Sequence, residues 1–157
     1  MLSSRSIEIS WNKPLNPKDS VFGYRARLMV ESECKVEIIF YCETCVDTRT
    51  IRNICGPGAI KINIVKSPEE MNTTITYEVT NLLPFTKYLL WLTAYNAAGD
   101  GDKEDKDVST DSEEPQKPTS VLAEVKSATD ITVTWNQPAP KPGLTTYTVQ
   151  AYEVIGG

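Results

Sequence analysis

The chain has no histidine among its 157 residues. This absence excludes catalytic triads with an imidazole base, zinc sites with histidine ligands and switches driven by histidine protonation. Long apolar runs are also missing: none approaches the roughly 18 residues that a membrane-spanning helix requires. The first residues have no apolar segment typical of a signal peptide. We therefore expect no direct membrane insertion by this segment.

Excess positive charge is absent as well. The chain has 16 Lys and Arg against 21 Asp and Glu, which gives a net charge of −5. Binding to nucleic acid needs clustered basic residues, so we expect no nucleic-acid partner. The acidic run 100–107 fails the calcium-loop pattern, because Glu104, Asp105 and Asp111 stand where that pattern has Asp or Asn, Gly and Glu. We predict no metal and no cofactor.

What the sequence does contain is a repeat. Residues 7–14 read Ile-Glu-Ile-Ser-Trp-Asn-Lys-Pro and residues 131–138 read Ile-Thr-Val-Thr-Trp-Asn-Gln-Pro. In each copy a tyrosine, Tyr24 or Tyr147, opens a second alternating run. Apolar and polar residues that alternate with period two indicate strands with one buried face. No segment shows a sustained helical period, so we predict an all-β fold.

Further residues carry a resemblance to a known family. Residues 82–88 read Leu-Leu-Pro-Phe-Thr-Lys-Tyr, and residues 94–101 read Ala-Tyr-Asn-Ala-Ala-Gly-Asp-Gly. With the tryptophan and tyrosine of the first copy, this ordered set resembles the fibronectin type III module, an immunoglobulin-like β-sandwich with a tyrosine corner. The resemblance implies these core residues: Trp11, Tyr24, Leu82, Tyr88, Trp135 and Tyr147.

The repeat also predicts the domain organisation. We expect 1–113 to form one nearly complete module and 119–157 to form the first three strands, A to C, of a second, truncated module. Residues 114–118, with two prolines, read as a stiff linker. The second copy lacks the strands that would cover its core, so we expect 119–157 to be mobile or completed by another chain. The spacing of the two copies exceeds a module of about 100 residues, which indicates an insertion at about 33–68.

All four cysteines lie in that insertion: Cys34, Cys42, Cys45 and Cys55. Residues 35–41 alternate like a strand, and a strand of this length separates Cys34 from Cys42 by about 26 Å. A disulfide needs Cα atoms about 4.4–6.8 Å apart. Cys45 lies only three residues further on and cannot return to Cys34. These limits leave the pairs Cys34–Cys55 and Cys42–Cys45, with residues 46–54 returning as a hairpin arm. A zinc knuckle and a redox-active pair are the alternatives, but a second ligand pair and a βαβ unit are both missing.

Two other positions stand out. Asn72 begins the one glycosylation sequon, Asn-Thr-Thr, after a polar turn, and we expect it to be exposed and glycosylated in a secreted protein. Trp91 alternates with Leu90 and Leu92, which places it on the outer face or an edge of a strand.

These features predict a binding or spacing role without catalysis. The resemblance implies an extracellular segment of a cell-surface receptor or adhesion protein, similar in arrangement to receptor-type tyrosine phosphatases. Its partner would be a protein ligand or another cell-surface protein, and the parent would be a single-pass membrane protein. Two alternatives remain: linker modules of a secreted carbohydrate-active enzyme, and a cytokine-receptor-like ligand-binding unit, whose Trp-Ser-x-Trp-Ser motif is absent.

Overall fold

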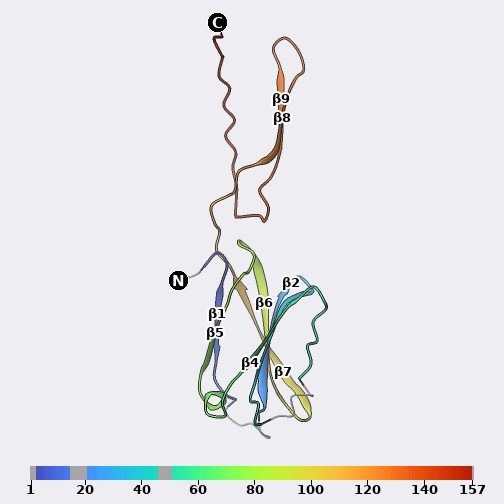
Figure 1. Cartoon of the computed structure of the whole chain (residues 1–157), viewed down its shortest axis with the longest axis vertical. Coiled ribbons are helices and arrows are strands. Elements are labelled where there is room, and N and C mark those ends of the chain that lie inside the picture. Colours follow the sequence, from blue (N-terminus) through green and yellow to red (C-terminus); the bar gives the residue numbers. More distant parts are fainter. Residues whose placement is uncertain (1–2, 15–20, 46–50, 157) are drawn as a thin grey trace.

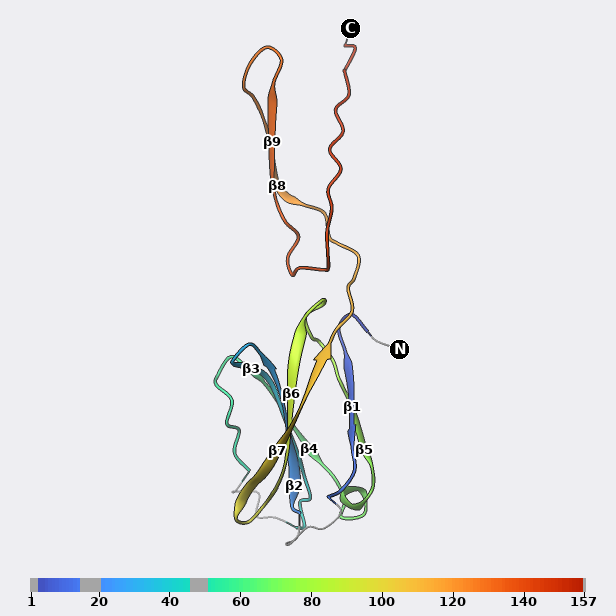
Figure 2. The same cartoon turned by 180° about the vertical axis from the view of Figure 1, so that it is seen from behind.

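A computed structural model describes residues 3–14, 21–45 and 51–156 of the chain (Figures 1 and 2). Within those ranges there are nine strands, one short 3-10 turn and no α-helix. In chain order the elements are β1 (Ile7–Trp11), β2 (Gly23–Val30), β3 (Glu33–Tyr41), β4 (Ile60–Val65), η2 (Glu70–Asn72), β5 (Ile75–Val79), β6 (Lys87–Asn96), β7 (Gly99–Ser109), β8 (Thr119–Val125) and β9 (Ile131–Asn136). The predicted all-β class is confirmed.

The first seven strands form a two-sheet sandwich. One sheet pairs β1 with β5, and the other has the order β4-β3-β2-β6-β7. Figure 2 shows β1 and β5 on one side and the larger sheet on the other. The alternation in β2 and β3 sends Tyr24, Leu28, Ile38 and Phe40 into the space between the sheets, where each is at most 2% exposed. The alternation predicted strands with one buried face, and the resemblance to the type III module implied the sandwich.

Trp11, predicted as a core residue, packs against the core but is not completely buried. Its ring packs edge-on against Tyr24 at 5.4 Å and against Phe40 at 4.9 Å between centroids. Nevertheless the side chain is only partly buried. The reason is that β1 is an edge strand, paired with β5 alone among the described strands, so one side of the tryptophan faces a groove.

The corner before β6 is held by a tyrosine. Tyr88 is 3% exposed, and its hydroxyl accepts a hydrogen bond of 3.0 Å from the backbone N–H of Leu83. Leu82, which precedes it, is 2% exposed and belongs to the core. Thr110, at the end of β7, adds a hydroxyl that donates to the Leu83 carbonyl at 2.7 Å. Together these bonds join the start of β6 to the end of β7.

The cysteine-rich region has a topology that the sequence did not predict. β4 lies beside β3 in parallel, with Val36 opposite Ile60 and Tyr41 opposite Val65. Parallel neighbours require a connection that returns to the starting end of the first strand. Residues 51–55 belong to that connection and form no strand, so the expected hairpin arm is wrong for its described part; 46–50 lie outside the described residues.

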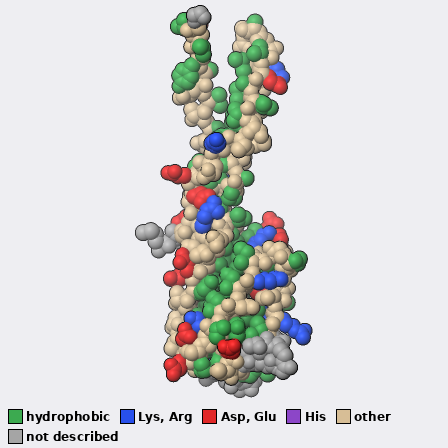
Figure 3. Space-filling view, in the orientation of Figure 1, with side chains coloured by type: hydrophobic (Ala, Val, Ile, Leu, Met, Phe, Trp, Pro, Cys, Tyr) green, Lys and Arg blue, Asp and Glu red, His purple; other side chains and the backbone are tan. Residues whose placement is uncertain are grey.

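Beyond the sandwich, β8 and β9 form a separate antiparallel pair. Trp135 packs on Tyr147 at 5.2 Å, as Trp11 packs on Tyr24, although both are only partly buried. The third strand expected near Tyr147 is not formed: 144–156 contain no strand, because no described strand lies beside them to pair with. Figure 3 shows hydrophobic side chains along both of these projecting segments. Among them are Val121, 60% exposed, and Val125, 77% exposed.

The residues that follow β7 are tied to the N-terminal end of the sandwich. The Arg5 guanidinium donates to both carboxylate oxygens of Glu113, at 2.9 and 2.5 Å. The backbone N–H of Asp111 donates to the Ser3 carbonyl at 3.0 Å, and the N–H of Glu113 donates to the Pro142 carbonyl at 2.8 Å. The residues that leave β7 therefore lie next to those that enter β1.

Candidate interaction surface

Two disulfides organise the region after β3. Cys34 is joined to Cys55 across 21 positions, and Cys42 is joined to Cys45 across three. Cys34 lies near the start of β3 and Cys42 directly after its end. The first bond therefore holds the returning connection against β3. We call residues 51–55 the clamped segment.

A buried carboxylate fixes the clamped segment to the sheet. Glu37 lies on the face of β3 that points away from the core, yet its side chain is fully buried. Its Oε2 accepts hydrogen bonds from the backbone N–H groups of Ile54 at 2.9 Å and Cys55 at 3.2 Å. Its Oε1 lies 3.5 Å from the Nε of Arg25. A buried carboxylate is tolerated only when it is paired in this way.

Arg25 extends the network to both sides. Its side chain is 8% exposed, and its Nη2 donates to the backbone carbonyl of Arg52 at 3.0 Å. Its Nη1 forms an ion pair with Asp100 at the start of β7. One guanidinium thus connects the clamped segment, β3 and β7, and the planar fork of arginine suits such a set of acceptors.

Tyr95 lies beside this network. The Arg25 guanidinium carbon stands 5.6 Å from the centre of the Tyr95 ring, and the hydroxyl donates to the Phe40 carbonyl at 3.4 Å. Burial raises the pKa of Tyr95 to about 12, against a smaller opposing effect of the Arg25 charge. The tyrosine crosses directly over Gly23: a Cβ there would lie 2.1 Å from the Phe40 carbonyl oxygen and 2.4 Å from the Tyr95 hydroxyl. Glycine at this position permits the close approach.

Further along the same face, Trp91 lies between two cations. The Lys103 ammonium is 4.3 Å from its ring centre and the Arg27 guanidinium carbon is 5.4 Å away. Such contacts stabilise by about 0.5–1 kcal/mol where they are exposed to solvent. Trp91 is partly buried on the outer face, the orientation that the alternation predicted.

The clamped segment presents side chains to solvent while its backbone is held. Arg52 and Asn53 are exposed, and Ile54 is 57% exposed although its own N–H is bonded to Glu37. An exposed apolar side chain on a backbone fixed by a disulfide and a buried carboxylate requires little further ordering when a partner binds.

Asn72 lies at the end of η2, on another part of the surface. Its Nδ2 donates to the Pro68 carbonyl at 2.8 Å, and its Oδ1 accepts from the Lys13 ammonium at 2.5 Å. The turn before it is capped reciprocally: the N–H of Ser67 donates to the Glu70 carboxylate, and the N–H of Glu70 donates to the Ser67 hydroxyl. The Lys66 ammonium also donates to the Glu70 carboxylate, at 3.1 Å. The hydrogen bond from the Ser67 N–H and this bond from Lys66 lower the pKa of Glu70. Asn72 is exposed, with one Nδ2 hydrogen free for replacement.

Within the described ranges, no three Cys, Asp and Glu side chains are grouped so that they could hold a metal ion. All four cysteines are in disulfides. A search of the described residues for a helix long and apolar enough to cross a membrane finds none.

Comparison with known proteins decides the family. The profile of the Fibronectin type III domain matches residues 2–111. The chain belongs to the fibronectin type III family. The resemblance that the sequence indicated is therefore confirmed for this type III chain. The matched residues include the whole clamped segment and the Arg25, Glu37 and Asp100 side chains of its network.

Curated relatives match nearly the whole type III chain but are far longer. Tyrosine-protein phosphatase 99A of Drosophila melanogaster is 25% identical over 87% of the chain, which covers 9% of that protein. Protein sidekick-1 of Homo sapiens is 26% identical over 98% of the chain and 6% of its own length. A putative receptor-type tyrosine-protein phosphatase of Aedes aegypti, mosPTP-1, is 22% identical over 96% of the chain and 10% of its length. The chain thus spans a tenth or less of these relatives.

The network of Arg25, Glu37 and Asp100 was not predicted. The available signal was weak: opposite charges at outward positions of two alternating strands, which usually indicates a solvated face. Only the return of the clamped segment over that face makes these charges a buried set.

Proposed function

We propose that this chain is an extracellular binding and spacing segment of a cell-surface receptor or adhesion protein, and that it recognises a protein partner through the clamped segment. Its support is membership of the fibronectin type III family together with relatives that include a putative receptor-type tyrosine-protein phosphatase. In this proposal the segment itself performs no catalysis. Any chemistry of a longer protein would belong to other domains.

One observation carries the proposal: the clamped segment is an ordered loop with exposed side chains on a rigid sheet. The Cys34–Cys55 disulfide and the carboxylate of Glu37 hold its backbone. The exposed Ile54 beside Arg52 combines an apolar contact with a charge. Loops on a rigid scaffold commonly carry recognition, and arginine is one of the residue types enriched among those that dominate binding energy at interfaces.

The proposed role includes the domain organisation. Residues 1–113 act as one module, 114–118 as the linker, and 119–157 as the beginning of a second module. The bonds of Glu113 to Arg5 and Pro142 support a spacer whose two parts are connected at a defined point. The proposed location is outside the cell, in the ectodomain of a single-pass membrane protein. The two disulfides and the sequon at Asn72 support the extracellular location.

The binding role is tested with arrayed, purified ectodomains of cell-surface proteins probed with the chain. We expect at least one partner with a Kd below about 10 µM. The variant Ile54→Asp should weaken that binding at least about tenfold. The matched control Leu83→Asp changes an equally apolar side chain, 49% exposed, outside the clamped segment, and should leave the affinity unchanged. Failure of every ectodomain to bind, or equal binding by Ile54→Asp, would contradict the proposal.

The extracellular location has its own test. Secreted from animal cells, the chain should carry a glycan at Asn72, seen as a loss of mass after treatment with an amidase that releases N-linked glycans. Asn72→Gln should lack that mass difference from the start. A secreted chain with an unmodified Asn72 would remove this support.

A further inference from the structure

The residues that follow β7 are built into the end of the sandwich. The N–H of Asp111 donates to the Ser3 carbonyl at 3.0 Å, and the Asp111 carbonyl accepts from the N–H of Phe85 at 2.9 Å. The N–H of Leu82 donates to the Arg5 carbonyl at 3.0 Å. These bonds join the entry to β1, the corner before β6 and the exit from β7. The backbone of Asp111 is therefore held as part of the sandwich, although it lies outside β7.

Two residues further on, Glu113 is bonded on two sides. Its carboxylate accepts both hydrogen bonds of the Arg5 guanidinium, and its N–H donates to the Pro142 carbonyl at 2.8 Å. Pro142 lies in the segment after β9, which we call the return segment, residues 137–143. Figure 2 shows the chain coming back toward the linker after β9, before it runs to the C-terminus. The second part of the chain is therefore attached to the sandwich by this contact as well as by the linker.

The composition of the return segment suits this contact. It reads Gln-Pro-Ala-Pro-Lys-Pro-Gly, so three of its seven residues are prolines. Proline fixes the backbone angle φ, and a segment with few accessible conformations loses little freedom when it docks. Pro142 and Gly143 are buried, whereas Leu144, the next residue, is 90% exposed. Burial in this part of the chain is thus greatest where the return segment meets Glu113.

Gly143 makes the close approach possible. A Cβ at this position would lie 2.8 Å from the Cβ of Ser112, well inside the separation of about 3.5–4.0 Å at which carbon atoms pack. The Ser112 Cβ is bonded directly to the backbone and cannot turn away as the end of a long side chain could. The φ of Gly143 is +156°, which residues with a side chain rarely adopt. Any other residue at 143 would push the return segment away from Glu113.

The corner before β6 borders the return segment without completing an apolar interface. Leu83 and Phe85 on one side and Pro140 and Lys141 on the other line a hollow of about 460 Å³. The Leu83 side chain is 49% exposed and the Phe85 side chain 44% exposed. Apolar packing between the two parts is therefore incomplete. The position of the return segment depends on the hydrogen bond at Glu113 and on the contact of Gly143 with Ser112.

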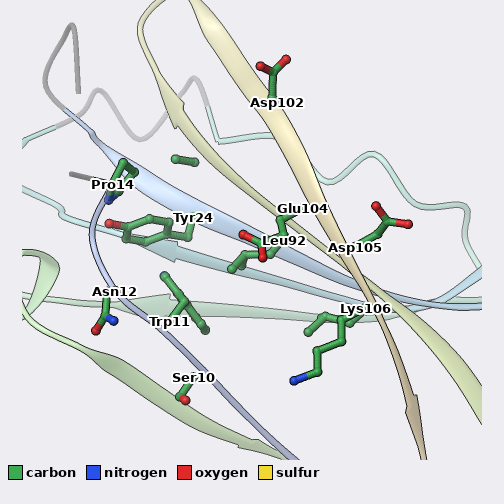
Figure 4. A pocket seen from close by; sticks show the side chains of 12 residues that line it. Ser10, Trp11, Asn12, Pro14, Tyr24, Leu92, Asp102, Glu104, Asp105 and Lys106 are labelled. Atoms are coloured by element: carbon green, nitrogen blue, oxygen red, sulfur yellow. The ribbon is translucent and has the colours of Figure 1, made fainter. Parts of the chain in front are cut away.

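We propose that Arg5, Glu113 and the return segment form a fixed joint, which sets the direction of the second part of the chain relative to the sandwich. Parts of a chain that are connected by a linker alone normally move relative to each other. The second attachment at Glu113 restricts that motion. The joint deepens the spacing role and rests on the proposed division of the chain into two parts. It uses neither the clamped segment nor the groove that Figure 4 shows beside Trp11.

Nuclear magnetic resonance of the whole chain tests the joint through hydrogen exchange and backbone relaxation. In the unchanged chain the Glu113 amide should be protected, and the amides of Ala139 and Lys141 should have order parameters near about 0.85, as in a rigid backbone. Gly143→Ala should speed exchange at Glu113 at least about tenfold, because its acceptor moves away. The order parameters of Ala139 and Lys141 should then fall below about 0.6.

The matched control is Gly156→Ala, a glycine of the second part with open space around it, which should change none of these values. The Asp111 amide, bonded to Ser3, should stay protected in Gly143→Ala and so show that the sandwich is intact. Arg5→Ala approaches the joint from the other side. It should also speed exchange at Glu113, while the Leu82 amide, bonded to the backbone carbonyl at position 5, stays protected.

Three results would overturn the proposal or part of it. A Glu113 amide that exchanges freely in the unchanged chain, or one that is equally protected in Gly143→Ala, would contradict the joint. Equal protection of Glu113 in Arg5→Ala would contradict the role given to Arg5. None of these results affects the binding test with Ile54→Asp, so a failure of the joint and a failure of the proposed recognition are distinguishable.

Discussion

Replacement of Glu37 by glutamine should destabilise the sandwich strongly, although the two side chains have nearly the same shape. The Oε1 of Glu37 faces the Nε of Arg25 and the N–H of Ile54, and Oε2 faces the N–H groups of Ile54 and Cys55. A glutamine amide has one oxygen and one NH₂ group. In either orientation the NH₂ group points at a donor, so one set of bonds becomes a clash.

The size of the effect follows from these contacts. Removal of one partner of a buried ion pair costs about 3–5 kcal/mol. Since glutamine retains one acceptor, and Arg25 retains Asp100, we expect the lower end, about 3 kcal/mol. The stability of a domain is typically about 5–15 kcal/mol, so this is a large part of the total. The thermal midpoint should fall by about 10 °C.

Urea unfolding measures the change in free energy, and hydrogen exchange locates it. The amide protons of Ile54 and Cys55 should exchange faster in Glu37→Gln by more than the global loss of stability explains, because the single amide oxygen cannot accept from both N–H groups and Arg25 as the two carboxylate oxygens do. Glu33→Gln is the control in the same strand. Glu33 makes a solvent-exposed ion pair with Lys35 at 2.6 Å, which contributes at most about 1 kcal/mol. If Glu37→Gln were no more destabilising than Glu33→Gln, the buried network would not hold the clamped segment.

Three further substitutions give separate expectations. Gly23→Ala should destabilise by about 2 kcal/mol or more, since its Cβ would overlap the Tyr95 hydroxyl, whereas Gly58→Ala, with open space around it, should have little effect in the same urea experiment. The pKa of Tyr95 is raised to about 12, so the folded state holds this proton more tightly than the unfolded state. Its contribution to stability is present below about pH 10 and is lost as the pH rises toward 12. Burial also raises the pKa of Tyr24. Alkaline absorbance titration should therefore show late tyrosine ionisation whose amplitude falls by one residue in Tyr95→Phe, and an unchanged amplitude would contradict the burial of Tyr95. Cys34→Ala/Cys55→Ala opens a loop of 21 positions and should cost about 3 kcal/mol, again by urea unfolding, and an unchanged midpoint would show that the clamp is not needed for stability.

Much of the fold could be predicted from local pattern. The alternation in 7–11 and 35–41 reports which face of a strand is buried, because successive side chains point to opposite faces. The resemblance carried by residues 82–88 implied the corner that joins two strands. These signals are strong because each depends on residues close together in sequence.

The burial of Glu37 and Arg25 could not be predicted in this way. Their alternation placed them on the outer face, which is the face that water normally covers in a one-sided sheet. Whether that face is covered depends on the path of a connection whose residues show no periodic pattern. Likewise the partial exposure of Trp11 depends on the absence, among the described strands, of a neighbour on the free edge of β1.

The sequence by itself thus determined the strands, the inward residues of the sandwich and the family, because strand alternation and short turn motifs are local and have one physical reading. The tertiary structure alone decided that β4 runs parallel to β3, that a returning segment converts an outward Glu37 into a buried acceptor, and that an apolar groove stays open beside β1. Each of these depends on which distant segment covers a given face, and burial, which sets the energy of every charge and apolar group, is known only when that covering segment is in place.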